Sequence, residues 1–226
     1  EWHRSYVTSI LQRDVRDLAR INGLTAMPNL LKLLAGRSSG LLNTSDLTRD
    51  AGIPNSTLKR YLALFEMLFL VYRVPAWSAN LSKRLIKAPK IMLCDTGLAC
   101  HLLGAGPRLL EHNRVLMGRL LENFVSNELK KQTSWSEASV EIMNYRTASG
   151  REIDFILEDR RGRVAAVEVK SSQAVRAEDF HAMRDLAEML ESHFVCGVLL
   201  HDGSRVLPFG KNLWSAPLSS LWSGEK

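Results

Sequence analysis

Apolar positions in the first part of the chain recur at the spacing of amphipathic helices. Residues 5–20 predict one such helix, and residues 27–34 predict a second that stops near Gly36. Residues 43–45 then supply capping oxygens to a short helix, which closes at Gly52. The pattern therefore begins as a series of helices joined by short turns.

A longer helix follows the glycine turn and runs from about residue 54 to Leu68, with Lys59 and Arg60 near its exposed start. Short helix, glycine turn and longer helix together are typical of a helix-turn-helix. Residues 69–74 and 90–94 are rich in strand-forming side chains and predict a hairpin. A helix-turn-helix followed by a hairpin predicts a winged helix.

The predicted wing is locally cationic. Between Met67 and Cys94 the chain has five basic residues and no acidic one. A basic stretch of this kind favours contact with a polyanion such as DNA. The candidate nucleic-acid contacts of the helix and the wing are Lys59, Arg60, Lys83, Arg84, Lys87 and Lys90.

The pattern changes after residues 104–107, where two glycines and a proline predict a domain boundary. A long helix over 115–131 is followed by three predicted strands, a helix and an apolar strand, and then a turn leading into residues 205–209. The predicted strands are 140–145, 152–157, 163–170 and 193–200, with the helix over 177–190. We therefore expect an α+β/α/β chain of two domains: a helical and winged-helix domain over 1–105, and an α-β-β-β-α-β core over 106–226.

Acidic residues lie on two neighbouring strands of this core. In 152–157, Ile153 and Phe155 are expected to face the core, which leaves Asp154 on the other side. In 163–170, Val167 and Val169 are expected to face the core, which leaves Glu168 and Lys170 together. If the strands are neighbours, Asp154, Glu168 and Lys170 converge.

Two close carboxylates repel each other unless a cation lies between them, and hard oxygen ligands select Mg²⁺ or Mn²⁺. A nearby lysine can orient water or hold charge that develops on a phosphate. Asp154, Glu168 and Lys170 are therefore candidate catalytic residues for metal-assisted phosphodiester hydrolysis, with Asp154 and Glu168 as metal ligands. Glu122, with Glu128 on the same helix, is a further candidate ligand. The alternative is that Glu168 and Lys170 form an exposed cross-strand pair.

Composition excludes several classes of protein. The 226 residues are 46% hydrophobic and 24% charged, with no apolar run long enough to span a membrane. Three cysteines without metal-ligand spacing favour buried thiols in a reducing cytoplasm, and the six histidines show no such spacing either. The net charge of +6 permits contact with nucleic acid. The opening Glu1 without a signal pattern favours a piece of a longer, cytoplasmic protein.

Asp154 with Glu168-Val169-Lys170 resembles the motif of the PD-(D/E)xK nuclease superfamily, whose core has the same α-β-β-β-α-β order. The whole chain resembles something narrower: the C-terminal part of bacterial and archaeal AAA+ ATPases that carry the domain of unknown function 4143. The segments that carry this resemblance are 11–15, 61–71, 87–90 with 95–98, 121–125 and 150–155.

This resemblance implies an ATPase module, then a winged helix, then a nuclease-like domain, in one parent polypeptide. No GxxxxGK(S/T) phosphate loop occurs in these residues, so ATP is expected only through the missing N-terminal module. Some active nucleases of the superfamily use a Gln and a Tyr in the helix after the last motif strand. Here Gln173 precedes that helix, which has no Tyr.

Three functions are compatible with these patterns. The first is a Mg²⁺- or Mn²⁺-dependent nuclease module beside a DNA-binding winged helix. The second is a catalytically inactive regulatory module that binds DNA or protein. The third makes the winged helix a protein-interaction and oligomerisation element. The expected partners are DNA and the upstream ATPase domain, with no membrane, and the sequence leaves homo-oligomer formation open.

Overall fold

A computed structural model describes residues 2–10, 26–80, 84, 87–147 and 150–222. The chain forms two compact units: residues 1–73 with 90–123, and residues 74–89 with 124–226. This division differs from the single boundary expected after residue 105. The difference arises because residues 74–89 pack with the second unit and because one long helix continues across the division.

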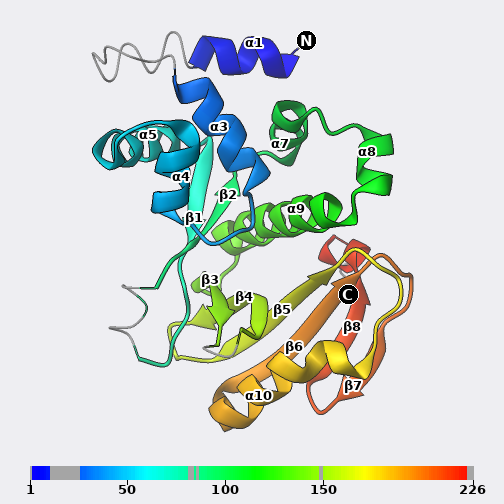
Figure 1. Ribbon diagram of the computed structural model, residues 1–226. Helices are drawn as coiled ribbons and strands as arrows, with labels where there is room; N and C mark the ends of the chain where they lie inside the picture. Colours follow the sequence, from blue (N-terminus) through cyan, green and yellow to red (C-terminus); the bar gives the residue numbers. More distant parts are fainter. Residues whose placement is uncertain (1, 11–25, 81–83, 85–86, 148–149, 223–226) are drawn as a thin grey trace. The chain divides into compact units, whose positions relative to one another are not determined.

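The first unit is mainly helical (Figure 1). It opens with a short helix, α1, of which the expected continuation beyond Ile10 lies outside the described residues. A two-stranded sheet, β1–β2, accompanies the helices. The elements are α1 (Trp2–Ser9), α3 (Met27–Gly36), α4 (Thr44–Ala51), α5 (Asn55–Met67), β1 (Val71–Val74), β2 (Lys90–Leu93), α7 (Thr96–Leu103), α8 (Pro107–His112) and the first half of α9 (Arg114–Trp135).

The turn between α4 and α5 follows from its residues. The side chain of Asn43 accepts a hydrogen bond from the Asp46 N–H at 3.1 Å and caps α4. Gly52 ends α4 in the left-handed conformation, with φ of 64°, which glycine adopts without strain. Pro54 then precedes α5. The predicted helix, glycine turn and helix are present, and Asp95 caps α7 by accepting from the Leu98 N–H.

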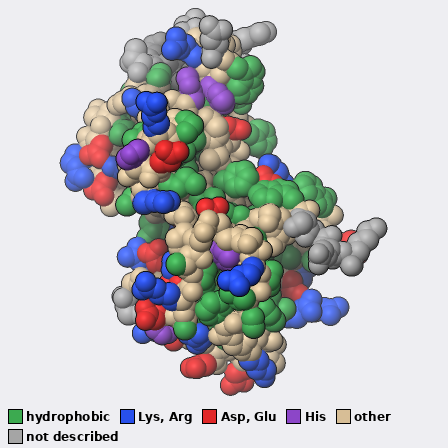
Figure 2. All heavy atoms as spheres, turned by 90° about the vertical axis from the view of Figure 1, so that its right-hand side faces the viewer, with side chains coloured by type: hydrophobic (Ala, Val, Ile, Leu, Met, Phe, Trp, Pro, Cys, Tyr) green, Lys and Arg blue, Asp and Glu red, His purple; other side chains and the backbone are tan. Residues whose placement is uncertain are grey.

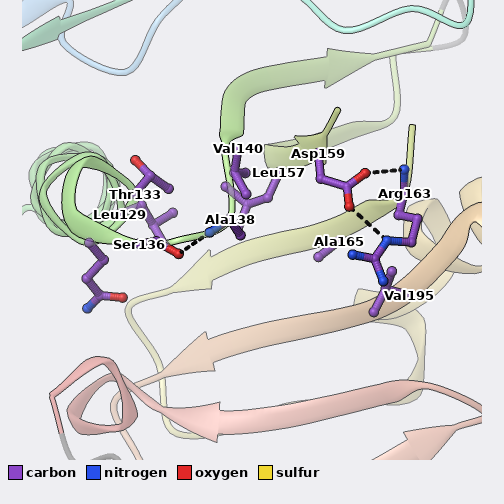
Figure 3. A pocket seen from close by; sticks show the side chains of 11 residues that line it. Leu129, Thr133, Ser136, Ala138, Val140, Leu157, Asp159, Arg163, Ala165 and Val195 are labelled. Carbon is purple, nitrogen blue, oxygen red and sulfur yellow. Dashed lines mark hydrogen bonds and ion pairs between the residues drawn. The ribbon is translucent and has the colours of Figure 1, made fainter. Parts of the chain in front are cut away.

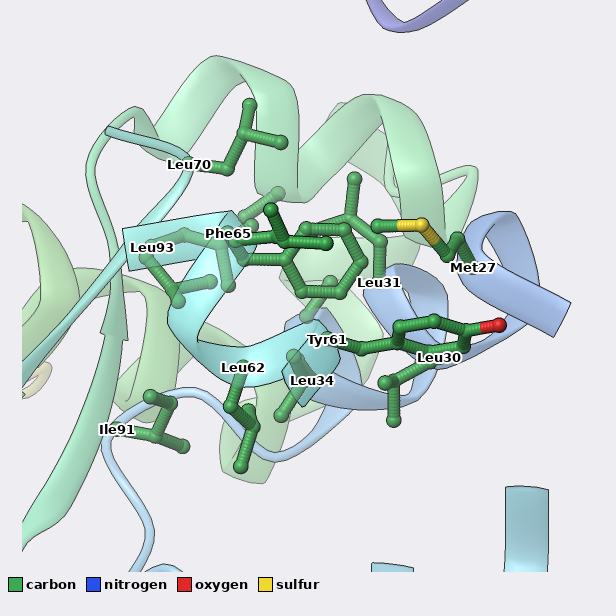
Figure 4. Close-up of a cluster of buried hydrophobic side chains, with 14 of the residues drawn as sticks. Met27, Leu30, Leu31, Leu34, Tyr61, Leu62, Phe65, Leu70, Ile91 and Leu93 are labelled. Atoms are coloured by element: carbon green, nitrogen blue, oxygen red, sulfur yellow. The ribbon is translucent and has the colours of Figure 1, made fainter. Parts of the chain in front are cut away.

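The core of the first unit lies between α3, α5 and the two strands (Figure 4). Leu30 and Leu34 of α3 and Phe65 of α5 have no solvent exposure. Burial of such side chains contributes about 1.5–3 kcal/mol each, so this cluster holds the helices together.

The second unit is built on a six-stranded mixed sheet in the order β3-β4-β5-β6-β8-β7. Strands β3, β4 and β5 are antiparallel neighbours, β5, β6 and β8 run parallel, and β7 is antiparallel to β8. Strand β8 was not expected from the sequence, because its five residues end in proline and carry little periodic signal. The elements are β3 (Val140–Arg146), β4 (Glu152–Asp159), β5 (Val164–Lys170), η3 (Ala177–Phe180), α10 (His181–Leu190), η4 (Glu191–His193), β6 (Phe194–His201), β7 (Leu207–Gly210), β8 (Leu213–Pro217) and η5 (Leu218–Leu221).

A β-bulge interrupts the simple alternation of β4. Met143 pairs with Ile156, but Tyr145 pairs with Ile153, so Asp154 and Phe155 together stand opposite one residue of β3. As a result Ile153 and Ile156 both join the cluster formed with α10, which Figure 1 shows lying against the sheet. Ile153 and Phe155 are both buried as expected, but they do not share one face of the sheet, because the extra residue shifts the alternation.

The segment between β1 and β2 makes backbone hydrogen bonds to β3 of the second unit. The Trp77 N–H donates to the Asn144 carbonyl at 2.6 Å, and the Asn144 N–H donates to the Pro75 carbonyl at 2.8 Å. The Trp77 ring is only 1% exposed and belongs to the core beside α10. The two strands of the predicted hairpin pair as β1 and β2, and the described residues between them belong to the second unit.

The three cysteines form no disulfide, and all three thiols are partly exposed where full burial was expected. Burial still raises the pKa of the Cys100 and Cys196 thiols. Among the helices of the described residues, none combines the length and apolar character needed to cross a bilayer.

Candidate functional site

Asp154 and Glu168 lie next to each other where the pairing of β4 and β5 ends. The last matched pair of the ladder is Phe155 with Val167. Beyond it, the Asp154 N–H donates to Glu168 Oε2 at 3.3 Å, and the Val169 N–H donates to Asp154 Oδ2 at 3.0 Å. Side-chain oxygens thus replace carbonyl groups as acceptors, and both carboxyl groups are held at the same point of the sheet.

Lys170 is the last residue of β5, two positions beyond Glu168, so strand alternation places both on one face. Its amine forms an ion pair with Asp179 of η3. Burial raises the pKa of Asp179, but the hydrogen bonds from Lys170 and from the Arg176 N–H outweigh it and hold that pKa below its usual value. Lys170 therefore belongs to the same neighbourhood but contacts a carboxylate that the sequence did not single out.

The Asp154–Glu168 pair suits a hard divalent cation. Mg²⁺ in proteins is commonly held by one or two carboxylates, with water and substrate phosphates as the remaining ligands. In the described part of the chain, no group of three or more His, Cys, Asp or Glu side chains is arranged to hold a metal ion.

Each candidate glutamate of α9 has partners of its own. The Glu122 carboxylate accepts from Lys90 Nζ at 2.6 Å, in an ion pair whose side chains are mostly buried. The Glu128 carboxylate binds Lys131 and the Trp222 indole, and mainly the Lys131 hydrogen bond lowers its pKa. Glu122 and Glu128 were predicted as ligands only because they lie on the helix that precedes the strands. Position on a helix does not predict ion pairs with residues elsewhere in the chain.

Two of the predicted DNA-binding cations are engaged by the chain's own carboxylates. Lys90 is 5% exposed beside Glu122. Arg84 binds Glu158 through two guanidinium nitrogens, one of them at 2.9 Å. Lys87 is exposed, with Nζ 3.5 Å from the Arg146 carbonyl, and Lys83 lies outside the described residues.

The Arg84 ion pair has a local cause. Glu141 and Glu158 stand directly opposite each other on β3 and β4, an arrangement in which like charges repel. Arg84 offsets this repulsion, and its hydrogen bond to Glu158, with attraction to Glu141, raises the Arg84 pKa against the effect of burial. Arg84 therefore secures segment 74–89 on the sheet.

Exposed basic residues remain on α5. Lys59 and Arg60 lie on its first turns, and the first turn has no acidic residue. On the face shown in Figure 2, by contrast, Lys and Arg side chains are interspersed with Asp and Glu in each unit. Lys59 and Arg60 are therefore exposed, whereas Arg84 and Lys90 are paired with carboxylates.

The second unit also contains an apolar groove between the C-terminal half of α9 and the sheet (Figure 3). Its volume is about 350 Å³, and Leu129, Leu157 and Val195 contribute to its wall. The Asp159–Arg163 ion pair lies at its margin. An adjoining cavity of about 380 Å³ is lined by Glu141 and Glu158. Neither hollow includes Asp154, Glu168 or Lys170.

The Asp154–Glu168 pair and the apolar groove lie in a region that matches a protein family of unknown function. Residues 117–221 match the family model described as a domain of unknown function, DUF4143. The expected resemblance to DUF4143 is therefore confirmed for this part of the chain. The DUF4143 match contains the entire six-stranded sheet and the Asp154–Glu168 pair. Residues 1–109 match a second model, domain of unknown function DUF8612, which includes the docked segment 74–89.

Two curated relatives are 30% identical to the chain over 169 residues. They are uncharacterized protein Mb2031c of Mycobacterium bovis and uncharacterized protein Rv2008c of Mycobacterium tuberculosis. The similarity covers 75% of this chain but only 37% of each relative, so the chain spans little more than a third of their length. No solved structure is significantly similar to the chain.

Proposed function

We propose that the DUF4143 region is a metal-dependent phosphodiesterase that acts on nucleic acid. The observation that carries this proposal is the juxtaposition of Asp154 and Glu168 at the end of the β4–β5 ladder. A bulge directly beside Asp154 adds support, because bulges re-aim side chains and are common next to active sites. The net charge of +6 suits an anionic substrate.

Each residue has a distinct role in this proposal. Asp154 and Glu168 would hold Mg²⁺ or Mn²⁺, which when bound polarises a phosphate and lowers the pKa of water. Lys170, 34% exposed at its side chain, would leave Asp179 and neutralise charge on the substrate phosphate. Asp179 would thus hold the lysine until substrate arrives.

The parent protein enters the proposal through the family. Because the chain resembles the C-terminal part of AAA+ ATPases, we place the nuclease-like region downstream of an ATPase module in a longer polypeptide. ATP binding would belong to that module. The relatives, which extend well beyond the matched segment, are long enough to contain one.

Calorimetric titration with Mn²⁺ tests the metal site. Wild type should release or absorb heat on binding, and Asp154→Asn and Glu168→Gln should abolish this signal because each removes one charged ligand. Glu152→Gln is the matched control, since Glu152 lies on the same strand but pairs with Arg146 at 2.9 Å. Unchanged heat in the two site variants, or none in wild type, would overturn the proposal.

Cleavage is tested separately with labelled single- and double-stranded DNA and RNA in the presence of Mn²⁺. Lys170→Met should bind Mn²⁺ like wild type but cleave far more slowly, because its role is toward the phosphate. Cleavage at the wild-type rate by Lys170→Met would show that the lysine has no part in the reaction.

A second candidate is nucleic-acid binding without cleavage, through the start of α5. It is favoured by the exposure of Lys59 and Arg60 after the α4–α5 turn. The salt dependence of DNA binding tests this candidate, because replacing Lys59 and Arg60 should reduce the slope of log K against log salt.

A further inference from the structure

Three parallel strands of the second unit end at the same edge of the sheet. In the ladders, Lys170 of β5 stands opposite His201 of β6, and His201 stands opposite Pro217 of β8. These residues are the last of their strands. In open sheets with parallel strands, ligands bind outside the carboxyl ends of the strands. The edge that ends in Lys170 and His201 is therefore a place where a ligand would be expected.

His201 is a buried side chain with one satisfied nitrogen. It is 4% exposed, and its Nδ1 accepts a hydrogen bond from the Gly203 N–H at 2.8 Å. A neutral imidazole that accepts at Nδ1 carries its proton on Nε2. Nε2 is buried and has no hydrogen-bond partner among the described residues.

The residues that follow β6 are fitted closely around this ring. A Cβ atom on Gly203 would lie 2.6 Å from both Cε1 and Nδ1 of His201, so only glycine allows this approach. The same position is 3.9 Å from the Gln173 carbonyl oxygen, in the segment that follows Lys170. Gly203 therefore packs directly against the ring, and Gln173 lies near Gly203.

A buried N–H donor without a partner is destabilising, so a ligand group that accepts from Nε2 would bind favourably. The proposed catalytic residues Glu168 and Lys170 lie on β5, which pairs with the strand that carries His201. Glu168 pairs with Leu199 and Lys170 pairs with His201, and because side chains alternate along a strand, all four lie on one face. His201 and Lys170 are neighbours across adjacent strands, whose spacing is about 4.8 Å.

We infer that His201 is a further substrate-binding residue, which donates from Nε2 to a phosphate oxygen held beside it by Lys170. This inference rests on the proposed phosphodiesterase function, since it assigns the anion that this edge accepts. The lysine supplies charge and the histidine supplies a directed donor. A phosphate seated here would satisfy the buried nitrogen that none of the described residues pairs with.

The test is a titration of the full chain with inorganic phosphate in the absence of metal, followed through the ¹⁵N signals of the histidine rings. The Nε2 signal of His201 should shift saturably, whereas exposed His193 should not. In Lys170→Met the shift should be lost. A His201 signal that does not respond, as expected if Nε2 binds only an internal water, would overturn the inference.

Variants give a second readout. His201→Phe should raise the dissociation constant for phosphate about tenfold or more, because hydrogen bonds to charged groups are worth that factor. Ser215→Ala is the matched control: Ser215 is also buried with an unpartnered hydroxyl, but it stands opposite Leu199, further from the edge. Equal affinity in wild type and a folded His201→Phe variant would also overturn the inference.

The outcomes separate this inference from the proposed function. Loss of Mn²⁺ binding at Asp154 and Glu168 is measured without phosphate, and the phosphate titration is measured without metal. A His201 response in a protein that binds no Mn²⁺ would refute the metal-dependent phosphodiesterase alone. Mn²⁺ binding and cleavage with a silent His201 would refute the histidine's role alone.

Discussion

Asn123 is a buried amide that satisfies several polar groups at once. Its Oδ1 accepts from the Leu93 N–H at 2.8 Å and from the Ser38 hydroxyl, and its Nδ2 donates to the Leu93 carbonyl at 3.0 Å. Nδ2 also lies 3.2 Å from the Thr96 hydroxyl. One side chain of α9 thus completes the backbone hydrogen bonds at the end of β2.

Asn123→Leu should therefore destabilise the first unit strongly. The substitution keeps the size of the side chain but removes the buried hydrogen bonds that Asn123 makes with the Leu93 N–H and carbonyl, at about 1–3 kcal/mol each. We expect the free energy of unfolding in urea to fall by about 2–5 kcal/mol.

Asn113→Ala is the control for Asn123→Leu. Asn113 is exposed and accepts one hydrogen bond, from the Leu116 N–H at 3.0 Å, so its loss should cost about 1 kcal/mol or less. Equal losses in both variants would contradict the special role of Asn123.

At this scale, sequence reasoning found Asp154 and Glu168 but missed their surroundings. The fourteen-residue separation and the hairpin pattern were enough to bring these two carboxyl groups together. Asp179 and His201 are brought to Lys170 by η3 and β6, and no local pattern predicts those contacts. Likewise, Glu158 lies 74 residues from Arg84, so counting charges could not reveal their ion pair.

Among the elements, the docked segment 74–89 is held partly by the Arg84–Glu158 ion pair, in addition to the contacts of Pro75 and Trp77. The Arg84 hydrogen bond lowers the pKa of Glu158, burial opposes this effect, and the Trp77 indole adds to the lowering from 3.3 Å. A carboxyl group whose pKa is lowered on folding stabilises the protein above its unfolded pKa. That stability is lost as the pH falls through the lowered value.

Glu158→Gln should therefore reduce the free energy of unfolding by about 1–3 kcal/mol at neutral pH, because it leaves a half-buried guanidinium without its counter-charge. The difference from wild type should shrink as the pH falls below the ordinary carboxyl range. Urea unfolding at several pH values measures it. A constant difference across the acid range would contradict the ion-pair explanation.

Helix α5 should determine the salt dependence of any DNA binding. Each phosphate neutralised by a cation contributes about −0.9 to the slope of log K against log salt. If Lys59 and Arg60 each contact one phosphate, the variant with both replaced by Ala should lose about 1.8 of the slope. Fluorescence anisotropy with duplex DNA at increasing salt measures this change.

Lys87→Ala is the control from segment 74–89, and it should keep the full slope. Lys87 is exposed, but its segment packs in the second unit instead of extending as a wing. If Lys87→Ala reduced the slope and the α5 variant did not, the segment between β1 and β2 would be the DNA-binding element.

The order of elements was largely predictable, whereas their pairing was not. Periodicity placed α3, α5, β4 and β5 close to their observed bounds, because long apolar patterns dominate local structure. The sequence did not predict the bulge at Asp154 or the parallel strand β8, because both depend on which strand becomes a neighbour. The same limit applied to segment 74–89, whose docking depends on Asn144, far along the chain.

For the whole molecule, the consequence is that the two compact units are not continuous in sequence. The chain passes into the second unit at residue 74, returns at residue 90 and leaves again within α9. Trp77 is therefore a test of the division, because it lies before residue 105 but is buried in the second unit's core.

Trp77→Ala should weaken the second unit selectively. Removing a buried Trp side chain costs about 3–5 kcal/mol. Hydrogen exchange in the full chain should accelerate at the amides of β4 and β5 while those of α3 and α5 keep their protection.

Phe65→Ala is the reciprocal variant of Trp77→Ala, since Phe65 is fully buried in the first unit's core. It should expose α3 and α5 and spare β4 and β5. Loss of protection at α3 and α5 in Trp77→Ala would instead support a single boundary after residue 105.

The docking of residues 75–77 also has a consequence for solubility. Strand β3 is one of the two edge strands of the six-stranded sheet, and an open strand edge can pair with a strand of another molecule. The hydrogen bonds of Pro75 and Trp77 to Asn144 occupy part of that edge. The segment that connects the two units thus also protects the protein against aggregation through intermolecular strand pairing.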